Sequence, residues 1–225
     1  MTRSAQQLSG ILEYQFQNPQ LLAYALTHRS AGSRNNERLE FLGDAILSLV
    51  IAEALYRQLP AATEGELSRL RATLVRRETL AELARGLDLG EYLTLGSGEL
   101  KSGGFRRDSI LSDALEAVFG ALYMDGGFVV ASRCIGRLFA QRLESLPSAA
   151  ALKDPKTQLQ EYLQSRRLEL PVYEVLEVHG QAHNQTFQVQ CRIPGTDHSS
   201  RGRGGSRRKA EQDAARNLLD ALGAG

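Results

Sequence analysis

Apolar residues recur with a helical period through residues 18–146, and short polar signals stand where the runs begin. Asn18 and Pro19 offer an N-cap and a first-turn proline ahead of the run QLLAYALTH, a combination that starts helices. Thr63 and Glu66 have the spacing of a capping box, and the periodic run behind them predicts one long helix. The pattern therefore predicts an all-α domain.

Glycines divide the rest of this region. Gly86 and Gly90 mark the end of the long helix, and residues 96–104 (GSGELKSGG) are typical of a loop. A further helix is expected from about Ser109, and an amphipathic run over residues 128–146 closes the domain.

The pattern changes after residue 146, where small residues without strong periodicity predict a linker. Asp154 and Pro155 can cap a helix, the runs VYEVLEVHG and QTFQVQCRI alternate as strands, and a glycine-rich basic turn precedes a last helix. The third strand is the least clearly marked. We predict an all-α domain over residues 1–147, a linker at 148–152 and a small α+β domain of α-β-β-β-α order over 153–225.

Composition restricts the class of protein only broadly. With 42% apolar and 24% charged residues, the 225-residue chain is typical of a folded protein rather than a disordered or fibrous one. No apolar run approaches the ~20 residues of a membrane helix, and the N-terminus lacks the apolar core of a signal peptide. We therefore expect a cytoplasmic protein without a membrane partner. The two cysteines, Cys134 and Cys191, lack the spacing of a zinc site or a disulfide framework.

Carboxylates gather on one face of the helix predicted around residues 36–45. Glu37, Glu40 and Asp44 fall within an arc of about 60° when successive residues advance by about 100°. Like charges so close repel one another unless a cation neutralises them. The opposite face carries the apolar residues that we expect in the core: Leu39, Leu42, Ile46 and Leu49.

A second helix repeats this arrangement, since Asp113 and Glu116 lie one turn apart and face away from an apolar stripe. If the two apolar stripes join one core, the two acidic edges converge. Such a cluster suits Mg²⁺ or Mn²⁺, which prefer carboxylate ligands. The alternative is that each acid is simply solvated, as we expect for four others: Glu53, Glu78, Glu82 and Glu91.

Phe41 lies near the acidic side of the first of these helices, where an aromatic ring would be exposed in a monomer. A second subunit related by two-fold symmetry would cover it. A loop of the same chain would do so equally well.

A basic segment, Arg201–Lys209, places five basic residues and no acid in nine positions. It is either a phosphate-binding segment near a helix N-terminus or a solvated basic loop. The glycines before Arg106 and Arg107 do not fit a nucleotide-binding loop, so we expect no nucleotide cofactor. That stretch either holds a nucleic-acid backbone or is a plain connection.

At these residues the chain resembles a known family. The segment NERLEFLGDA (Asn36–Ala45) is similar to the signature of the ribonuclease III endonuclease domain. Further segments resemble bacterial members in the same order along nearly the whole chain: ALTHRS (25–30), EGELSRLRATLV (64–75), GELKSGGFRRDSILSDALEA (98–117) and KDPKTQLQEYLQ (153–164).

The resemblance implies a role for each matching acid. It makes four residues the catalytic metal ligands, with Glu116 the most damaging to lose: Glu40, Asp44, Asp113 and Glu116. It makes Glu37 and Glu64 auxiliary acids, and it places Phe41 in the contact of a homodimer.

The C-terminal domain resembles a double-stranded-RNA-binding domain, which reads duplex shape through minor grooves and phosphates. The resemblance implies three RNA-binding groups: Thr157, Gln160, Glu161 and Gln164 on the first helix, His183 in the strand loop, and Arg207, Arg208 and Lys209 at the last helix. Gln181 and Gln185 depart from the usual proline and basic residue, which predicts weaker contact by that loop.

The implied activity is hydrolysis of double-stranded RNA with Mg²⁺, for which Mn²⁺ can substitute, leaving 5′-phosphate and 3′-hydroxyl ends with short 3′ overhangs. Expected substrates are ribosomal RNA precursors and other structured transcripts, messengers included. The scattered histidines favour metal-assisted hydrolysis over a histidine mechanism. The alternatives are a double-stranded-RNA-binding protein that does not cleave and a metal nuclease that acts on DNA.

Overall fold

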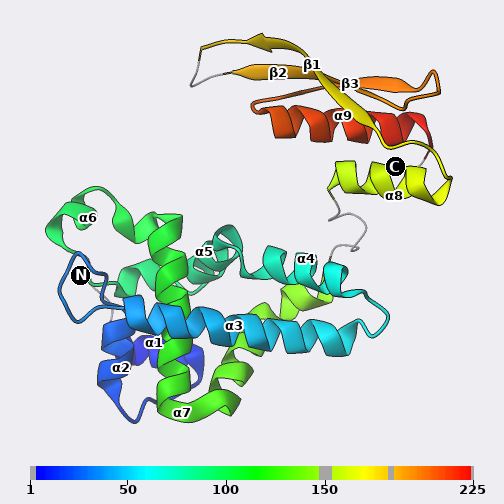
Figure 1. Cartoon of the computed structure of the whole chain (residues 1–225). Coiled ribbons are helices and arrows are strands. Elements are labelled where there is room, and N and C mark those ends of the chain that lie inside the picture. Colours follow the sequence, from blue (N-terminus) through cyan, green and yellow to red (C-terminus); the bar gives the residue numbers. More distant parts are fainter. Residues whose placement is uncertain (1–3, 147–153, 182–184, 224–225) are drawn as a thin grey trace. The chain divides into compact units, whose positions relative to one another are not determined.

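The computed structural model describes residues 4–146, 154–181 and 185–223, and the chain divides into two compact units, residues 1–149 and 150–225 (Figure 1). The predicted linker at 148–152 and the predicted RNA contact His183 lie outside the described residues.

The first unit is helical throughout its regular structure, so the all-α prediction is confirmed. Its elements, which Figure 1 colours from blue to green, are α1 (Ala5–Leu12), α2 (Pro19–Ala25), α3 (Glu37–Gln58), α4 (Glu64–Val75), α5 (Arg77–Gly86), α6 (Ser97–Lys101) and α7 (Asp108–Glu144), with short 3₁₀ turns η1 (Leu89–Tyr92) and η2 (Gly104–Arg106).

Two of the expected helix starts form as the sequence predicts. The Asn18 side chain accepts a hydrogen bond from the backbone N–H of Gln20, with Pro19 in the first turn of α2. Thr63 and Glu66 form both hydrogen bonds of a capping box at the start of α4.

The single long helix predicted behind Thr63 is wrong, because the chain turns at Arg76 (φ −68°, ψ 154°) and separates α4 from α5. The break leaves the Thr73 carbonyl without its helical partner, and the buried Thr79 hydroxyl donates to it at 2.9 Å. The turn also lets α5 pack its buried side, which includes Leu80 and Ala84, against α7. The loop predicted over residues 96–104 likewise contains a short helix, α6.

Helix α7 is the core of the unit. It bends at Gly127, whose positive φ of 74° is readily adopted only by glycine. By length and composition α7 could span a membrane, but half of its most apolar window is buried among the other helices, as in a core helix. The bend separates the helix expected from Ser109 from the amphipathic run expected after it.

Helix α3 packs on α7 with a face that differs from the prediction. Its buried residues include Ile46, Leu47 and Val50, whereas the Leu49 side chain is 55% exposed. Leu39 and Leu42 are only partly buried. The apolar stripe expected in the core is therefore wrong in part, because α7 contacts α3 along the row that contains Gly43 and Leu47.

The second unit has the order α8 (Pro155–Ser165), β1 (Val172–His179), β2 (Thr186–Arg192), β3 (Ser199–Gly204) and α9 (Arg207–Ala221), which confirms the predicted α-β-β-β-α arrangement. The antiparallel sheet has the order β1-β2-β3. Helix α9 packs on β2 and β3, and α8 packs on α9 (Figure 1). A small apolar core lies between: Leu159, Leu163, Cys191, Ile193, Ala214, Ala215, Leu218 and Leu219.

Strand β3 occupies part of the stretch expected to be a glycine-rich basic turn. A Cβ atom on Gly202 would lie 2.1 Å from the backbone nitrogen of Ala214, so the strand needs glycine there for α9 to pack this closely. The other edge of β3 is also occupied by α9: Asp213 accepts a hydrogen bond from the Arg203 N–H at 3.0 Å, and Asn217 donates to the Arg201 carbonyl at 2.8 Å.

Candidate functional site

Helices α3 and α7 touch backbone to backbone at Gly43 and Gly120. A Cβ atom on Gly43 would lie 1.8 Å from the carbonyl oxygen of Glu116, and one on Gly120 would lie 2.2 Å from that of Leu39. Both distances are far inside van der Waals contact. Glycine at both positions therefore permits the two acidic faces to meet, and helical periodicity alone does not reveal this.

The acids of the two helices converge at this crossing. Glu40, Asp113 and Glu116 each offer a carboxylate oxygen, and these oxygens all lie within 4.8 Å of one another. Asp44 lies close enough to raise the pKa values of both Glu40 and Glu116. The four acids predicted as metal ligands thus form one electrostatic group.

The electrostatics of this group favour a bound cation. Burial, and then the charges of Asp44, Asp113 and Glu40, raise the pKa of Glu116 from 4.5 to about 8. Burial and the neighbouring acids, Asp113 first, also raise the pKa of Glu40. A divalent cation would remove this repulsion, and a set of carboxylates without cysteine or histidine matches what Mg²⁺ or Mn²⁺ prefers.

A cavity of about 330 Å³ opens beside Glu40 and Asp113, with charges of both signs on its walls. Its other lining residues are His28, Arg29, Asn36, Glu37, Glu99, Arg107, Ser109 and Ile110. Arg29 pairs with Glu37 at 3.6 Å, and Arg107 pairs with Glu99 at 3.0 Å.

The sequence interpretation missed Arg29 and Glu99 as members of this site. Their signal was present in the segments 25–30 and 98–117, but it lies on separate turns of the chain that only the fold brings together. The two arginines are the cavity's candidates for contact with a phosphate, since guanidinium groups match phosphate oxygens well.

The two auxiliary acids lie in different surroundings. Glu37 lines the cavity at the start of α3. Glu64 starts α4, where its carboxylate accepts a hydrogen bond from the Ser68 hydroxyl at 2.7 Å, and it is not among the residues that line the cavity. Its role stays a prediction.

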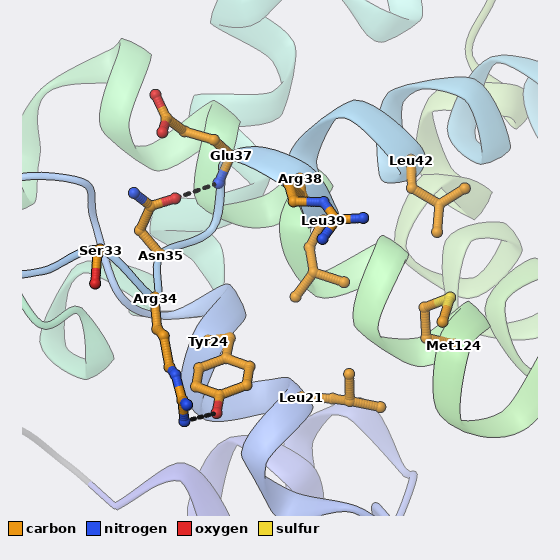
Figure 2. Close-up of a pocket in the computed structure, with 10 residues that line it drawn as sticks. All are labelled: Leu21, Tyr24, Ser33, Arg34, Asn35, Glu37, Arg38, Leu39, Leu42 and Met124. Atoms are coloured by element: carbon orange, nitrogen blue, oxygen red, sulfur yellow. Dashed lines mark hydrogen bonds between the residues drawn. The ribbon is translucent and has the colours of Figure 1, made fainter.

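A larger cavity, of about 610 Å³, is lined in part by α3 and has apolar side chains along one side (Figure 2). Leu21, Leu39, Leu42 and Met124 contribute its apolar wall, and Arg34 donates to the Tyr24 hydroxyl at its polar end. On the same helix the Phe41 side chain is 81% exposed, as predicted for a monomer. Four other large apolar side chains on α3 and α7 are also exposed: Leu49, Tyr56, Val129 and Phe128.

In the second unit the predicted RNA contacts that the structure describes are all exposed. Thr157, Gln160, Glu161 and Gln164 lie on α8, and Arg207, Arg208 and Lys209 form the first turn of α9, where the Ser206 side chain caps the helix.

An ion-pair network around the buried Glu211 joins the starts of α8 and α9. The Glu211 carboxylate accepts hydrogen bonds from Lys156 at 2.6 Å and from Arg207 at 2.9 Å. Burial alone would raise the pKa of Glu211, but these bonds lower it below its usual value. Arg208 reaches Asp154 at 3.6 Å across the same junction. The network therefore sets the polar face of α8 beside the basic turn of α9.

Comparisons with known proteins agree with both halves of this description. The Ribonuclease-III-like family matches residues 18–143, and the double-stranded RNA binding motif matches residues 155–222. "Ribonuclease 3" of Alkalilimnicola ehrlichii is 60% identical over 96% of this chain and 94% of its own length, and that of Vibrio vulnificus is 57% identical over 99% of both.

A solved structure supports the fold of the first unit. The nuclease domain of ribonuclease III from Campylobacter jejuni, described for flexibility in a region involved in dimer formation, is 44% identical with a TM-score of 0.61 and covers 61% of this chain and 97% of its own.

Proposed function

Because the chain belongs to the ribonuclease III family, we propose that it is an endoribonuclease that hydrolyses phosphodiester bonds of double-stranded RNA with Mg²⁺. Glu40, Asp44, Asp113 and Glu116 would hold the ion. The observation that carries this proposal is the convergence of three of these carboxylates within 4.8 Å. Mn²⁺ would substitute, because it accepts the same oxygen ligands.

The bound ion would supply Lewis acidity, which activates water and stabilises charge on the phosphate. The residues of the chain prepare the site for it. Burial and then the neighbouring carboxylates raise the pKa of Glu116 to about 8, so a cation beside it would favour its ionised form. Glu37 and Glu99 hold Arg29 and Arg107 in the cavity, where their guanidinium groups would bind phosphate oxygens.

The products follow from the chemistry of direct hydrolysis. When water attacks the phosphorus, the bond between phosphorus and the 3′ oxygen breaks. The phosphate then stays on the 5′ oxygen of the downstream fragment. We therefore expect 5′-phosphate and 3′-hydroxyl ends. Paired sites acting across one duplex would leave the short 3′ overhangs.

We propose a homodimer as the active unit. The exposed Phe41 ring and the apolar cavity of about 610 Å³ lie on one helix, and a two-fold axis would let each ring enter the partner's cavity. Phe41→Ser should convert the dimer to monomers in sedimentation velocity, because it removes the apolar side chain that the partner would cover. The same change at Leu100, an exposed apolar side chain on α6 that does not line the cavity, is the matched control. An unaltered dimer in the Phe41 variant contradicts this contact.

The second unit would present the duplex to this dimer. The polar face of α8 suits 2′-hydroxyls in a minor groove, and the first turn of α9 combines free N–H groups with exposed cations that suit phosphates. Ribosomal RNA precursors and other structured transcripts contain the helical stems that such a surface requires. We propose that the enzyme acts on them in the cytoplasm.

The direct test is incubation of the full chain with duplex RNA, with and without Mg²⁺. Cleavage should require Mg²⁺ and should fall by roughly 10³-fold in Glu116→Gln, since a lost metal ligand removes several kcal/mol of transition-state stabilisation. Glu53→Gln is the matched control, because Glu53 pairs with Arg57 one turn along α3 and is neither a member of the acid cluster nor a lining residue of the cavity. Binding without cleavage in Mg²⁺ would favour a protein that only binds RNA, and equal cleavage of duplex DNA would favour a DNA nuclease.

A further inference from the structure

The outer face of the second unit's sheet carries a group of arginines that the contacts described so far do not use. In β2 and β3 the residues Val189, Cys191 and Gly202 point toward the helices, since they are buried. Side chains alternate along a strand. Arg192, Arg201 and Arg203 therefore point away from α9, and all three are exposed.

The strand register places these arginines next to one another. Arg201 pairs with Gln190 and Arg203 with Gln188, while Arg192 pairs with Ser199 and so lies diagonal to Arg201. Neighbours of this kind on one sheet face lie about 7–8 Å apart. The three cations thus form a compact group along the β3 side of the sheet, which we call the sheet arginines.

The sheet arginines lack a carboxylate partner among the residues that the structure describes. The Arg203 guanidinium donates a hydrogen bond to an uncharged group, the side-chain carbonyl of Gln188, at 3.4 Å. This differs from the α9 turn, where Arg207 and Arg208 both reach carboxylates. Three unneutralised guanidinium groups on one surface attract polyanions.

Acids on the same face lie at its opposite edge. Glu174 pairs with Gln190, and Glu177 with Gln188, so each glutamate is two strands away from the arginine of β3 in its row. Arg192, on the middle strand, pairs with Val172 and is therefore a diagonal neighbour of Glu174. Two strand spacings amount to about 9.6 Å, close to the screening length in physiological salt. The face is therefore polarised, and an anionic chain is attracted along β3 and repelled from β1.

We propose that the sheet arginines form a second RNA site, which binds the phosphate backbone of a further duplex while α8 and α9 hold the first. The site rests on the proposed function for its ligand class. Arg192, Arg201 and Arg203 would each contact one phosphate, with Gln188 and Gln190 able to bond to sugar or phosphate oxygens. Because these contacts are made to phosphates and not to base edges, binding there is weak and independent of sequence.

The test is a titration of the full chain carrying Glu116→Gln, in metal-free buffer at low salt, with RNA duplexes of about 16 base pairs, the span of one such domain. The number of duplexes bound per protomer is measured by sedimentation velocity. Adding Arg201→Gln and Arg203→Gln should weaken a second, weaker binding phase about tenfold and reduce its salt slope by about 2, since about one counterion is released per lost contact. The tighter phase should be unchanged.

The matched variant is Arg208→Gln with Lys209→Gln, which removes two cations from α9 and should weaken the tighter phase alone. A second phase that persists at full strength without Arg201 and Arg203, or a variant that weakens both phases equally, overturns the proposal. So does displacement of the second duplex by poly-glutamate at equal charge, which would indicate an acidic protein as the ligand. If the tighter phase is absent from every variant, the proposed function fails, and the second phase still decides the role of the sheet arginines.

Discussion

The two units place charge in opposite ways. In the nuclease unit four acids converge in a partly buried group, and the pKa of Glu116 is raised to about 8. In the RNA-binding unit the cations are exposed at a helix start and on a sheet face. The chemistry of the acids depends on distances that the backbone fixes. The attraction of RNA to the exposed cations depends on a longer-range electrostatic field, which changes little when a side chain moves slightly.

Both units nevertheless use glycine to bring backbones together. Gly43 and Gly120 let α3 and α7 touch beneath the acids, whereas Gly202 lets α9 pack on β3. Only the first contact sets the separation of functional side chains. The same kind of substitution should therefore affect catalysis in one unit and mainly stability in the other.

Of the two glycine substitutions, the larger effect on catalysis is expected from Gly120→Ala. The added methyl would lie 2.2 Å from the Leu39 carbonyl oxygen. Restoring ordinary van der Waals contact requires α3 and α7 to move apart by roughly 1 Å. Such a displacement of reacting groups costs on the order of 10²-fold in rate. The cleavage rate should fall and the Mg²⁺ concentration needed for half of full activity should rise. Duplex binding without metal should persist. Gly136→Ala on the same helix meets no atom within 4 Å and should change neither quantity.

Gly202→Ala should mainly reduce the stability of the RNA-binding unit. The methyl would lie 2.1 Å from the Ala214 backbone nitrogen, and overpacking of this kind costs about 1–3 kcal/mol or more. We expect an earlier melting transition and weaker RNA binding, with the rate at saturating RNA and low salt reduced by less than in Gly120→Ala. A larger loss of saturated rate than in Gly120→Ala would remove the distinction between the units.

The pH dependence of stability tests the burial of Glu116. Its pKa is higher in the folded, metal-free protein than the ordinary 4.5, so its contribution to stability is full below 4.5 and is lost as the pH rises through about 8. Thermal melts without metal should therefore show falling stability across this window, and Glu116→Gln should flatten the fall. Mg²⁺ should raise the melting temperature more at pH 8 than at pH 6, because protons no longer compete for the site. A stabilisation by Mg²⁺ that is equal at both pH values contradicts this account.

The smallest effect on cleavage is expected from Arg208→Gln with Lys209→Gln. Each lost phosphate contact should reduce the salt slope of duplex binding by about 1 and weaken affinity uniformly across sequences. Cleavage at saturating RNA should be nearly unchanged, as single-turnover rates would show. A rate that falls with affinity at saturation would mean that the α9 turn also positions the duplex over the acids.

The sequence predicts the acidic faces but not the reason that they meet. Glu40 with Asp44, and Asp113 with Glu116, follow from helical periodicity. Their convergence depends on a tertiary contact between two glycines that no local pattern marks. Arg29 and Glu99 escaped notice for the same reason, because long-range packing brings them to the cavity.

Local misreadings have equally specific causes. The periodic run behind Thr63 continues through Arg76, so the break there is invisible without the packing of α5 on α7. Residues 199–204 resembled a turn because glycines occupy two of the inward positions of β3, Gly202 and Gly204. Because α9 packs so closely on β3, glycine replaces the apolar residues that would alternate with polar ones and so reveal a strand in the sequence.

The hydrogen bonds that Asp213 and Asn217 make to β3 also bear on what happens when many copies crowd together. A strand edge with unpaired N–H and C=O groups can pair edge to edge with a sheet of a neighbouring molecule. Here the outward N–H of Arg203 and the carbonyl of Arg201 are already occupied, and a register shift between Val175 and Glu177 irregularises the strand at the other edge. We therefore expect that molecules bound close together along one long RNA do not aggregate through the edges of this sheet.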